Sequence, residues 1–144
     1  MAVAQILKQK GRAVITVGPA QTLSDVAGIL AKNRIGAVVV VDKAGAIAGI
    51  VSERDVVRAL ANEGAAALAK HVREFMTAKV RTCGPGDTEG ELMGLMTEHR
   101  IRHLPVVEAG KLAGMISIGD VVKLRIETIE NEAAQMKSYI ASAG

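Results

Sequence analysis

The chain has 144 residues, 49% of them apolar, and a formal net charge of +3. This length and composition suit one compact domain or two fused halves with a common core, and they exclude a disordered chain. Aromatic residues make up 1% of the chain, and the Lys and Arg residues are scattered among almost as many acids. Binding of RNA or DNA is therefore disfavoured, because stacking side chains and a basic stripe are both missing.

The first segment, "MAVAQILKQKGR", does not have the pattern of a secretory signal. Its apolar part is too short and its basic residues follow that part instead of preceding it. No later stretch reaches the length of a membrane-spanning helix. Cys83 is the only cysteine, so the chain forms no internal disulfide. The sequence predicts a cytoplasmic protein with no membrane partner.

The chain contains an internal duplication. "VITVGPAQTLSDVAGILAKNRIGAVVVV" (14–41) aligns without a gap on "VRTCGPGDTEGELMGLMTEHRIRHLPVV" (80–107), with Gly-Pro, Thr, Gly, Arg-Ile and Val-Val at matching positions. After a deletion of one residue, "SERDVV" (52–57) aligns on "SIGDVV" (117–122). Two copies are too few for a solenoid, so we expect them to pack on each other about a pseudo-two-fold axis.

Each copy predicts the order strand, helix, strand, strand, helix. Thr22 or Thr88 opens a segment with apolar residues at helical spacing, and β-branched runs at "IGAVVVVD" and "LPVVE" then form hairpins with "AIAGIVS" and "KLAGMIS". The fold class is α+β, with repeats at 10–66 and 74–125. The Ala-rich link at 62–74 is predicted to be helical.

Residues 126–144 are predicted to extend the last helix. The apolar residues in this extension follow steps of four and three, which is the pattern of a helix that packs on another helix: Ile126, Ile129, Ala133, Met136 and Ile140. Two partners fit this pattern. One is the same helix in a second copy of the chain, and the other is the N-terminal segment, where Ile6 and Leu7 offer a small apolar face. We favour the homodimer.

The repeated Ser-x-x-Asp phrase marks the start of the second helix in each copy, at Ser52 with Asp55 and at Ser117 with Asp120. A carboxylate can accept hydrogen bonds from both hydroxyls of a ribose, and a Ser hydroxyl at a helix N-terminus favours an anion. The same phrase is also close to a capping box, which contributes only to helix stability. From the residues alone both interpretations stay open.

The two copies resemble a tandem pair of CBS domains, the Bateman module, through "GAVVVVDKAGAIAGIVSERD" and "RHLPVVEAGKLAGMISIGD". The resemblance covers about residues 10 to 125. It implies a disc with two clefts that bind adenosine-containing ligands and regulate an attached or separate protein. It therefore favours ribose binding by Asp55 and Asp120.

The resemblance also implies cleft positions for Thr16 and Thr82, although each could equally be an ordinary strand residue. Arg102 and His103 have no basic counterparts in the first copy and are expected to contact phosphate, with Arg54 as a weaker candidate. Walls for adenine are expected from four aliphatic residues, most of which would be core in any case: Ile35, Val38, Ile101 and Leu104.

No catalytic or metal chemistry is predicted. His99 and His103 lack carboxylate or thiolate companions at metal-ligand spacing, and "GPGD" at 84–87 is not followed by the Lys-Ser/Thr of a phosphate-binding loop. The sequence predicts neither a metal site nor an enzyme.

We therefore predict a stand-alone, non-catalytic energy-sensing module that binds AMP, or ADP or ATP, and signals to a separate, unknown protein. The alternatives are a dimerisation module with empty clefts and a sensor of NAD or S-adenosylmethionine. Replacing both Ser117 and Asp120 by Ala is expected to remove nucleotide from their cleft. The clefts should differ in affinity, because Gly36 and Ala37 stand opposite Arg102 and His103.

Overall fold

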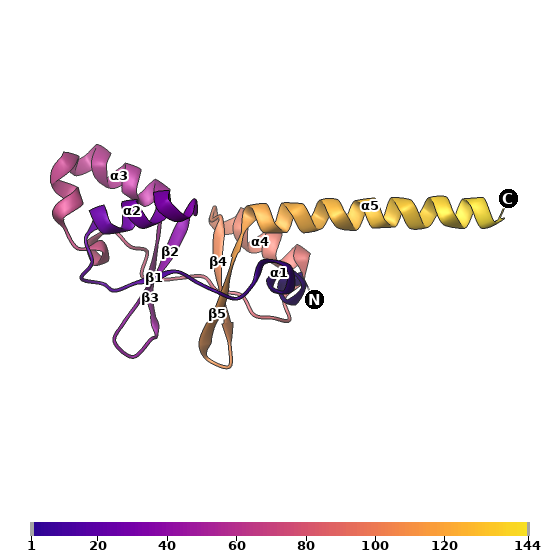
Figure 1. Cartoon of the computed structure of the whole chain (residues 1–144), viewed down its shortest axis with the longest axis horizontal. Helices are drawn as coiled ribbons and strands as arrows, with labels where there is room; N and C mark the ends of the chain where they lie inside the picture. Colours follow the sequence, from indigo (N-terminus) through magenta and orange to yellow (C-terminus); the bar gives the residue numbers. More distant parts are fainter. Residues whose placement is uncertain (1, 144) are drawn as a thin grey trace.

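Two units of sheet and helix lie side by side in the computed structural model, which describes residues 2–143, and a long helix projects from the second unit (Figure 1). The first unit contains β1 (Thr16–Val17), α2 (Leu23–Asn33), β2 (Ala37–Val41), β3 (Ile47–Ser52) and α3 (Glu53–Glu63). Strand β1 pairs with β2 in parallel, and β2 pairs with β3 in antiparallel fashion. This is the predicted order of elements.

The second unit contains α4 (Glu89–His99), β4 (His103–Glu108), β5 (Lys111–Ser117) and α5 (Ile118–Ala143). The first strand predicted for this copy is reduced to one parallel bridge between Cys83 and Val106. The Cys83 amide donates to the Pro105 carbonyl at 3.0 Å, and the Val107 amide donates to the Cys83 carbonyl at 2.8 Å. The position of a strand is kept, but the pairing is too short to form one.

The link between the units is not the helix predicted at 62–74. Gly64 has a φ of +70° and ends α3, and two short 3-10 helices follow, η1 (Gly64–Ala69) and η2 (Val72–Glu74). The chain turns because its backbone bonds back to the first unit. The Val72 amide donates to Gln21 at 2.8 Å, and Thr77 exchanges two backbone hydrogen bonds with Ile50 in β3. These bonds oppose a continuous helix and leave residues 77–81 running between the units.

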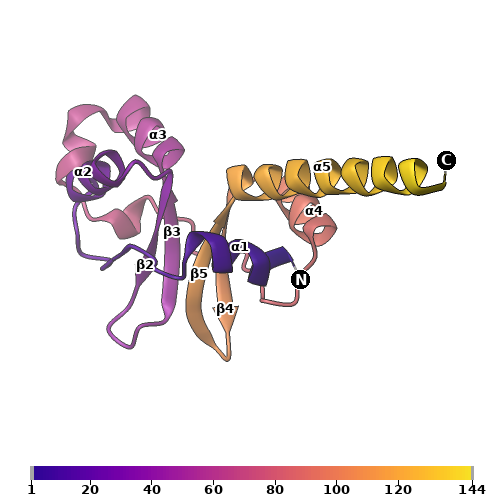
Figure 2. The same ribbon diagram turned by 45° about the vertical axis from the view of Figure 1, so that its right-hand side comes forward.

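Each unit has its own aliphatic core, and the N-terminal helix belongs to the second one. Helix α1 (Ala2–Lys10) precedes the first repeat in the sequence, yet it lies against β5 (Figure 2). Val3, Ile6 and Leu7 are buried in one cluster with Leu92, Met96, Leu104 and Ile116. The second repeat is thus completed by the segment that precedes the first.

The first repeat receives the equivalent contact from the link. A Cβ on Gly49 would lie 2.5 Å from the sulfur of Met76, and a Cβ on Gly114 would lie 2.5 Å from a Leu7 methyl group. Each hairpin therefore has a glycine over which a side chain from outside its own repeat lies. Through these two contacts the link packs on the first repeat and α1 packs on the second.

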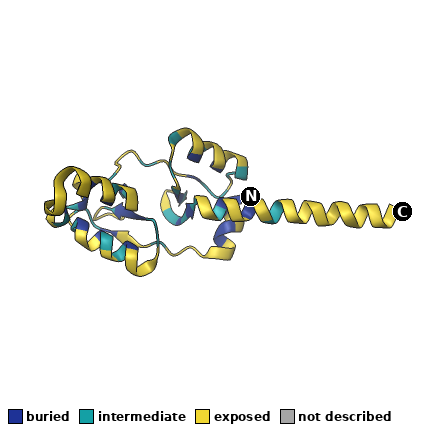
Figure 3. Ribbon diagram, turned by 90° about the horizontal axis from the view of Figure 1, so that it is seen from above, coloured by how far each residue is buried: buried dark blue, intermediate teal, exposed yellow. Residues whose placement is uncertain are grey.

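Helix α5 leaves the core after its first two turns. Val121 and Leu124 are buried, whereas the residues from Ile126 onward are mostly exposed and the helix extends away from both units (Figure 3). The alternative in which this extension folds back over residues 1–10 is therefore wrong, since only the start of α5 shares a core with α1. No helix among residues 2–143 is long and apolar enough to cross a membrane.

Candidate functional site

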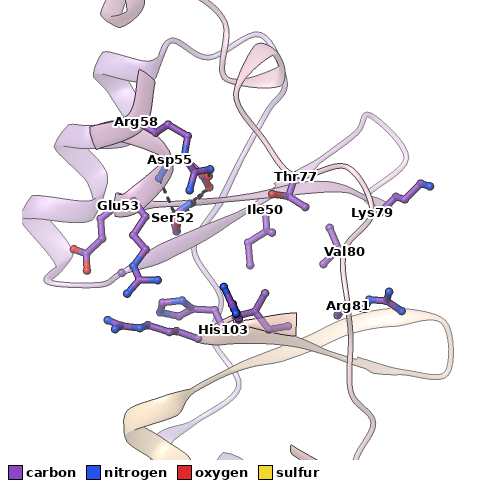
Figure 4. Close-up of a pocket in the computed structure, with 15 residues that line it drawn as sticks. Ile50, Ser52, Glu53, Asp55, Arg58, Thr77, Lys79, Val80, Arg81 and His103 are labelled. Atoms are coloured by element: carbon purple, nitrogen blue, oxygen red, sulfur yellow. Dashed lines mark hydrogen bonds and ion pairs between the residues drawn. The ribbon is translucent and has the colours of Figure 1, made fainter. Parts of the chain in front are cut away.

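Two cavities lie between the repeats at pseudo-equivalent positions. The first, here named the Asp55 cleft, has a volume of about 240 Å³. It is lined by Gly36, Ile50, residues 52–55 and Arg58 of the first repeat, and by Thr77, residues 79–81 and residues 100–103 from the link and the second repeat (Figure 4). The second, the Ser117 cleft, has a volume of about 370 Å³ and is lined by Met115, Ser117 and His103 with Lys10, residues 13–15 and residues 34–37. Each cleft thus joins the helix start of one repeat to the strand entrance of the other.

Ser52 and Asp55 form a capping box at the start of α3. The Ser52 amide donates to Asp55 Oδ2 at 2.8 Å, and the Asp55 amide donates to Ser52 Oγ at 3.4 Å. These bonds bear out the capping interpretation of the phrase. They engage Oδ2, while Asp55 Oδ1 lies 3.7 Å from the Arg58 guanidinium. The carboxylate therefore keeps acceptor capacity toward the cleft, so capping and ligand binding are compatible in one residue.

Positive charge is concentrated around the Asp55 cleft. The lining contains six Lys or Arg residues and two acids, Glu53 and Asp55. The cations are Arg54, Arg58, Lys79, Arg81, Arg100 and Arg102. A cleft lined by several guanidinium groups and a carboxylate favours a ligand that has phosphate at one end and hydroxyls at the other. The sequence had singled out Arg54 and Arg102 but not the other four.

Arg100 holds an uncommon backbone conformation. It ends α4 with a φ of +53°, and Arg34 ends α2 with a φ of +52°. Glycine is the usual residue there, and another residue costs about 1 kcal/mol. Both repeats nevertheless carry Arg, and each Arg lines one of the clefts. The repeated Arg-Ile pair in the sequence was the signal that could have identified these positions.

His103 lies at the entrance of β4 and lines both clefts. A Cβ on Gly36 would lie 2.9 Å from its Nε2, so the glycine leaves room for the imidazole between the repeats. Burial lowers the pKa of His103, and the nearby charge of Lys10 lowers it further. Both effects favour the neutral ring, and an anion beside it would favour its protonated form.

The Ser117 cleft differs because a lysine occupies it. Asp120 Oδ2 accepts from the Ser117 amide at 2.9 Å, as in the first repeat, but it also accepts from Lys10 Nζ at 2.7 Å. Lys10 donates as well to the Met115 carbonyl at 2.8 Å. Burial alone would raise the pKa of Asp120, but hydrogen bonds from Lys10 and Ser117 outweigh it and lower the pKa.

Four of the predicted cleft residues lie elsewhere. Thr16 and Thr82 are exposed and line neither cleft, because each precedes a buried residue, Val17 or Cys83, and successive side chains point to opposite sides. Val38 and Leu104 are fully buried in the two cores, since each follows a residue that faces a cleft. These positions correct the predicted walls.

Other predicted residues do reach the clefts. Ile101 lines the Asp55 cleft and Ile35 lines the Ser117 cleft. Thr77 also lines the Asp55 cleft, a position that the sequence analysis did not assign to a cleft. Arg102 lies opposite Asp55 of the other repeat instead of beside Asp120 of its own.

Residues 2–143 contain no group of three or more His, Cys, Asp or Glu side chains placed to hold a metal ion. Cys83 is buried, and burial together with the charge of Asp87 raises the pKa of its thiol to about 12. A thiol with that pKa is a poor nucleophile near neutral pH.

Two similar repeats of strands and helices that enclose a pair of clefts define a module with internal symmetry. The family profile for the CBS domain matches residues 4–62 and 72–127, so the chain belongs to the CBS domain family and contains a tandem pair of these domains. The chain is similar to the CBS-domain containing protein ATU1752 from Agrobacterium tumefaciens, with 50% identity and a TM-score of 0.84. That match covers 85% of this chain and 92% of the other. It is also 33% identical to the mitochondrial CBS domain-containing protein CBSX3 of Arabidopsis thaliana, over 96% of this chain and 71% of that protein.

Two further structural neighbours are complexes with adenosine compounds. The CBS domain protein PAE2072 from Pyrobaculum aerophilum, complexed with AMP, is 29% identical with a TM-score of 0.74, and the match covers 83% of this chain and 89% of that one. The CBS domain pair of protein MJ0100, in complex with 5'-methylthioadenosine and S-adenosyl-L-methionine, is 26% identical with a TM-score of 0.78. Its match covers 88% of this chain and 96% of that one. CBS pairs of this fold thus include binders of adenosine compounds.

Proposed function

We propose that this CBS pair is a non-catalytic regulatory module that binds an adenine nucleotide in the Asp55 cleft. The observation that carries the proposal is the pairing across that cleft of one half-buried carboxylate, Asp55, with the basic side chains of Arg81, Arg100 and Arg102. A nucleoside phosphate has the complementary ends, a ribose diol and an anion. AMP is the first candidate, and ADP and ATP are the next.

In this proposal each end of the ligand has its own partners. Asp55 accepts hydrogen bonds from the ribose hydroxyls, and the guanidinium groups of Arg100 and Arg102 hold the phosphate. The adenine ring lies among the aliphatic side chains of Ile50, Val80 and Ile101, which line the same cleft. The AMP complex of PAE2072 supports a nucleotide of this class.

The charge of the cleft separates AMP from the other adenosine ligands. S-adenosylmethionine carries a sulfonium cation and lacks phosphate, so six Lys or Arg residues around the cleft disfavour it. We expect AMP, ADP or ATP to raise the midpoint of thermal unfolding, since a ligand at a hundred times its Kd stabilises by about 2.7 kcal/mol. For a chain of this size that amounts to several degrees.

The measurement is thermal unfolding with AMP, ADP, ATP, NAD, S-adenosylmethionine and, as the control base, GMP. A shift with S-adenosylmethionine alone would contradict the assignment to nucleotides. No shift with any compound would favour the second candidate function, a dimerisation module with empty clefts.

The regulatory part of the proposal rests on the position of the Asp55 cleft between the two repeats. Its walls come from both repeats, so a ligand that binds there contacts both units at once. A ligand shifts the equilibrium between two arrangements only by its difference in affinity for them. We expect the bound arrangement to be the one in which the repeats close on the nucleotide. A separate protein would then bind the open and closed arrangements with different affinity.

The extension of α5 is proposed to pair with the same helix of a second copy. Ile126, Met136 and Ile140 are 51%, 60% and 63% exposed, and their spacing is that of a helix–helix seam. The apolar strip continues at its base into a groove formed by Met93, Ile118 and Val122. A helix with one apolar strip along it is self-complementary about a two-fold axis, which supports a second copy as the partner.

Replacing both Ile126 and Met136 by Glu is expected to convert a dimer into a monomer, because it puts charges into the seam. Both residues are exposed in the single chain, so its fold should be unchanged. Sedimentation velocity at micromolar concentration measures the change. Asn131→Glu, which adds a charge on the other side of the helix, is the matched control. A chain that is monomeric before substitution would contradict the pairing.

A further inference from the structure

Lys10 is the last residue of α1, and its ammonium group lies where the second ribose site would be. The pseudo-symmetry relates Asp120 to Asp55, so Asp120 is the second carboxylate suited to a ribose. In this structure Asp120 Oδ2 and the Met115 carbonyl both accept from Lys10 Nζ, at 2.7 and 2.8 Å. Met115 and Ser117 line the cleft, so the lysine lies inside it together with them.

The fold holds Lys10 in this position. Leu7, one turn earlier in α1, is buried against Gly114 of β5. Gly11 follows Lys10 with a φ of +98°, and its amide donates to the Leu7 carbonyl at 2.7 Å. Helix α1 therefore ends at the mouth of the cleft, and the anchored turn directs the lysine toward Asp120.

The Asp55 cleft has no such occupant among the described residues. The nearest cation to Asp55 is Arg58 of its own helix, at 3.7 Å. The link that enters this cleft carries Met76 over Gly49, where α1 carries Leu7 over Gly114. The two clefts are built from equivalent elements, but only in the Ser117 cleft does a lysine of the chain form an ion pair with the carboxylate.

The contact between Lys10 and Asp120 is accessible to solvent. The two side chains are 38% and 24% exposed, and an ion pair with this exposure contributes little to folding. It competes with a ligand for the carboxylate, since Lys10 Nζ already donates to Asp120 Oδ2 at 2.7 Å, while the rest of the cleft, about 370 Å³, stays open. Its removal should therefore free the carboxylate without unfolding the second repeat.

We infer that Lys10 blocks the ribose carboxylate of the Ser117 cleft from within the chain, so that one nucleotide binds per chain until this lysine is withdrawn. The inference rests on the proposed function, because the ligand it excludes is the nucleotide assigned to the Asp55 cleft. It makes Lys10 the residue that decides how many nucleotides the pair holds.

The test is isothermal titration of AMP into the full chain and into its Lys10→Ala variant. We expect one site in the original chain and two in the variant, because the affinity of the Ser117 cleft for AMP rises at least fivefold, from below detection in the original chain. Adding Asp120→Asn to Lys10→Ala should remove the second site again. Lys8→Ala, which removes an exposed lysine from the same helix, and Lys10→Arg, which keeps a cation at the carboxylate, should both retain one site.

Each outcome decides the inference. Two sites of similar affinity in the original chain, or a single site in both proteins, overturns it. Weaker binding in Lys10→Ala also overturns it, since Lys10 would then be a ligand contact. If only Lys10→Ala binds, and Asp120→Asn abolishes that binding, the block by Lys10 stands although the assignment to the Asp55 cleft fails. If neither protein binds AMP, both proposals fail.

Discussion

Leu104→Ala is expected to lower the free energy of unfolding by about 2–5 kcal/mol, the cost of a cavity at a fully buried leucine. Leu104 is fully buried in the second core, in one cluster with Leu92 and Ile116. The preceding residue, His103, faces the clefts, so the Leu104 side chain points away from them. Urea denaturation measures the change in free energy, with the slope of the transition compared to confirm two-state unfolding.

Ile101→Ala is the matched variant for this prediction. Ile101 is only partly buried and lines the Asp55 cleft, so its truncation should cost less stability and weaken AMP binding. Leu104→Ala should leave the affinity of the folded chain for AMP unchanged. A loss of less than about 1 kcal/mol for Leu104→Ala would mean that this residue does not pack as a core leucine.

The order of elements could be predicted from the sequence because it depends on local patterns that occur twice. Thr22 and Thr88 cap α2 and α4, and Ser52 caps α3, as the polar residues before each apolar segment indicated. The partner of α1 could not be predicted. Ile6 and Leu7 show that a short helix has one apolar face, but they do not say which repeat that face covers. The repeat that α1 covers depends on a contact between Leu7 and Gly114, which lie more than a hundred residues apart in the sequence.

Several of the predicted site residues do line one cleft, but the sequence did not indicate which parts of the two repeats would combine there. Ser52, Asp55, Arg54 and Arg102 all line one cleft. The sequence analysis assigned ribose binding to Asp55 and Asp120 alike and did not indicate which of them Arg102 would face. An alignment of two copies compares equivalent residues, whereas each cleft combines different parts of opposite copies. Only the three-dimensional arrangement brings Arg102 to Asp55 and Lys10 to Asp120.

The predicted cytoplasmic location stays a prediction. Cys83 is buried beside the bridge to Val106, and its raised thiol pKa agrees with a structural role in the core. An inert buried thiol is compatible with more than one compartment.

Asp55→Asn is expected to weaken AMP binding by about 10- to 100-fold, since hydrogen bonds to a charged group contribute about 1.5–3 kcal/mol and each 1.4 kcal/mol is tenfold in affinity. The amide keeps an oxygen that can accept from the Ser52 amide, so the cap of α3 should persist. Asp120→Asn is expected to leave AMP affinity nearly unchanged, because Lys10 already occupies that carboxylate.

Asp25→Asn controls for the loss of a cap. Asp25 and Thr22 form the same capping box at the start of α2, and neither residue lines a cleft. The stability of Asp25→Asn therefore reports what the substitution costs a helix without any effect on ligand. A loss of affinity in Asp25→Asn equal to that in Asp55→Asn would assign the effect to folding.

The most direct test of the proposed nucleotide site is isothermal titration of AMP into the original chain, Asp55→Asn and Asp120→Asn under one set of conditions. We expect one site in the original chain, a loss of 10- to 100-fold in Asp55→Asn and nearly the original affinity in Asp120→Asn. If affinity is lost in Asp120→Asn and kept in Asp55→Asn, the nucleotide binds in the Ser117 cleft and the assignment to Asp55 is contradicted.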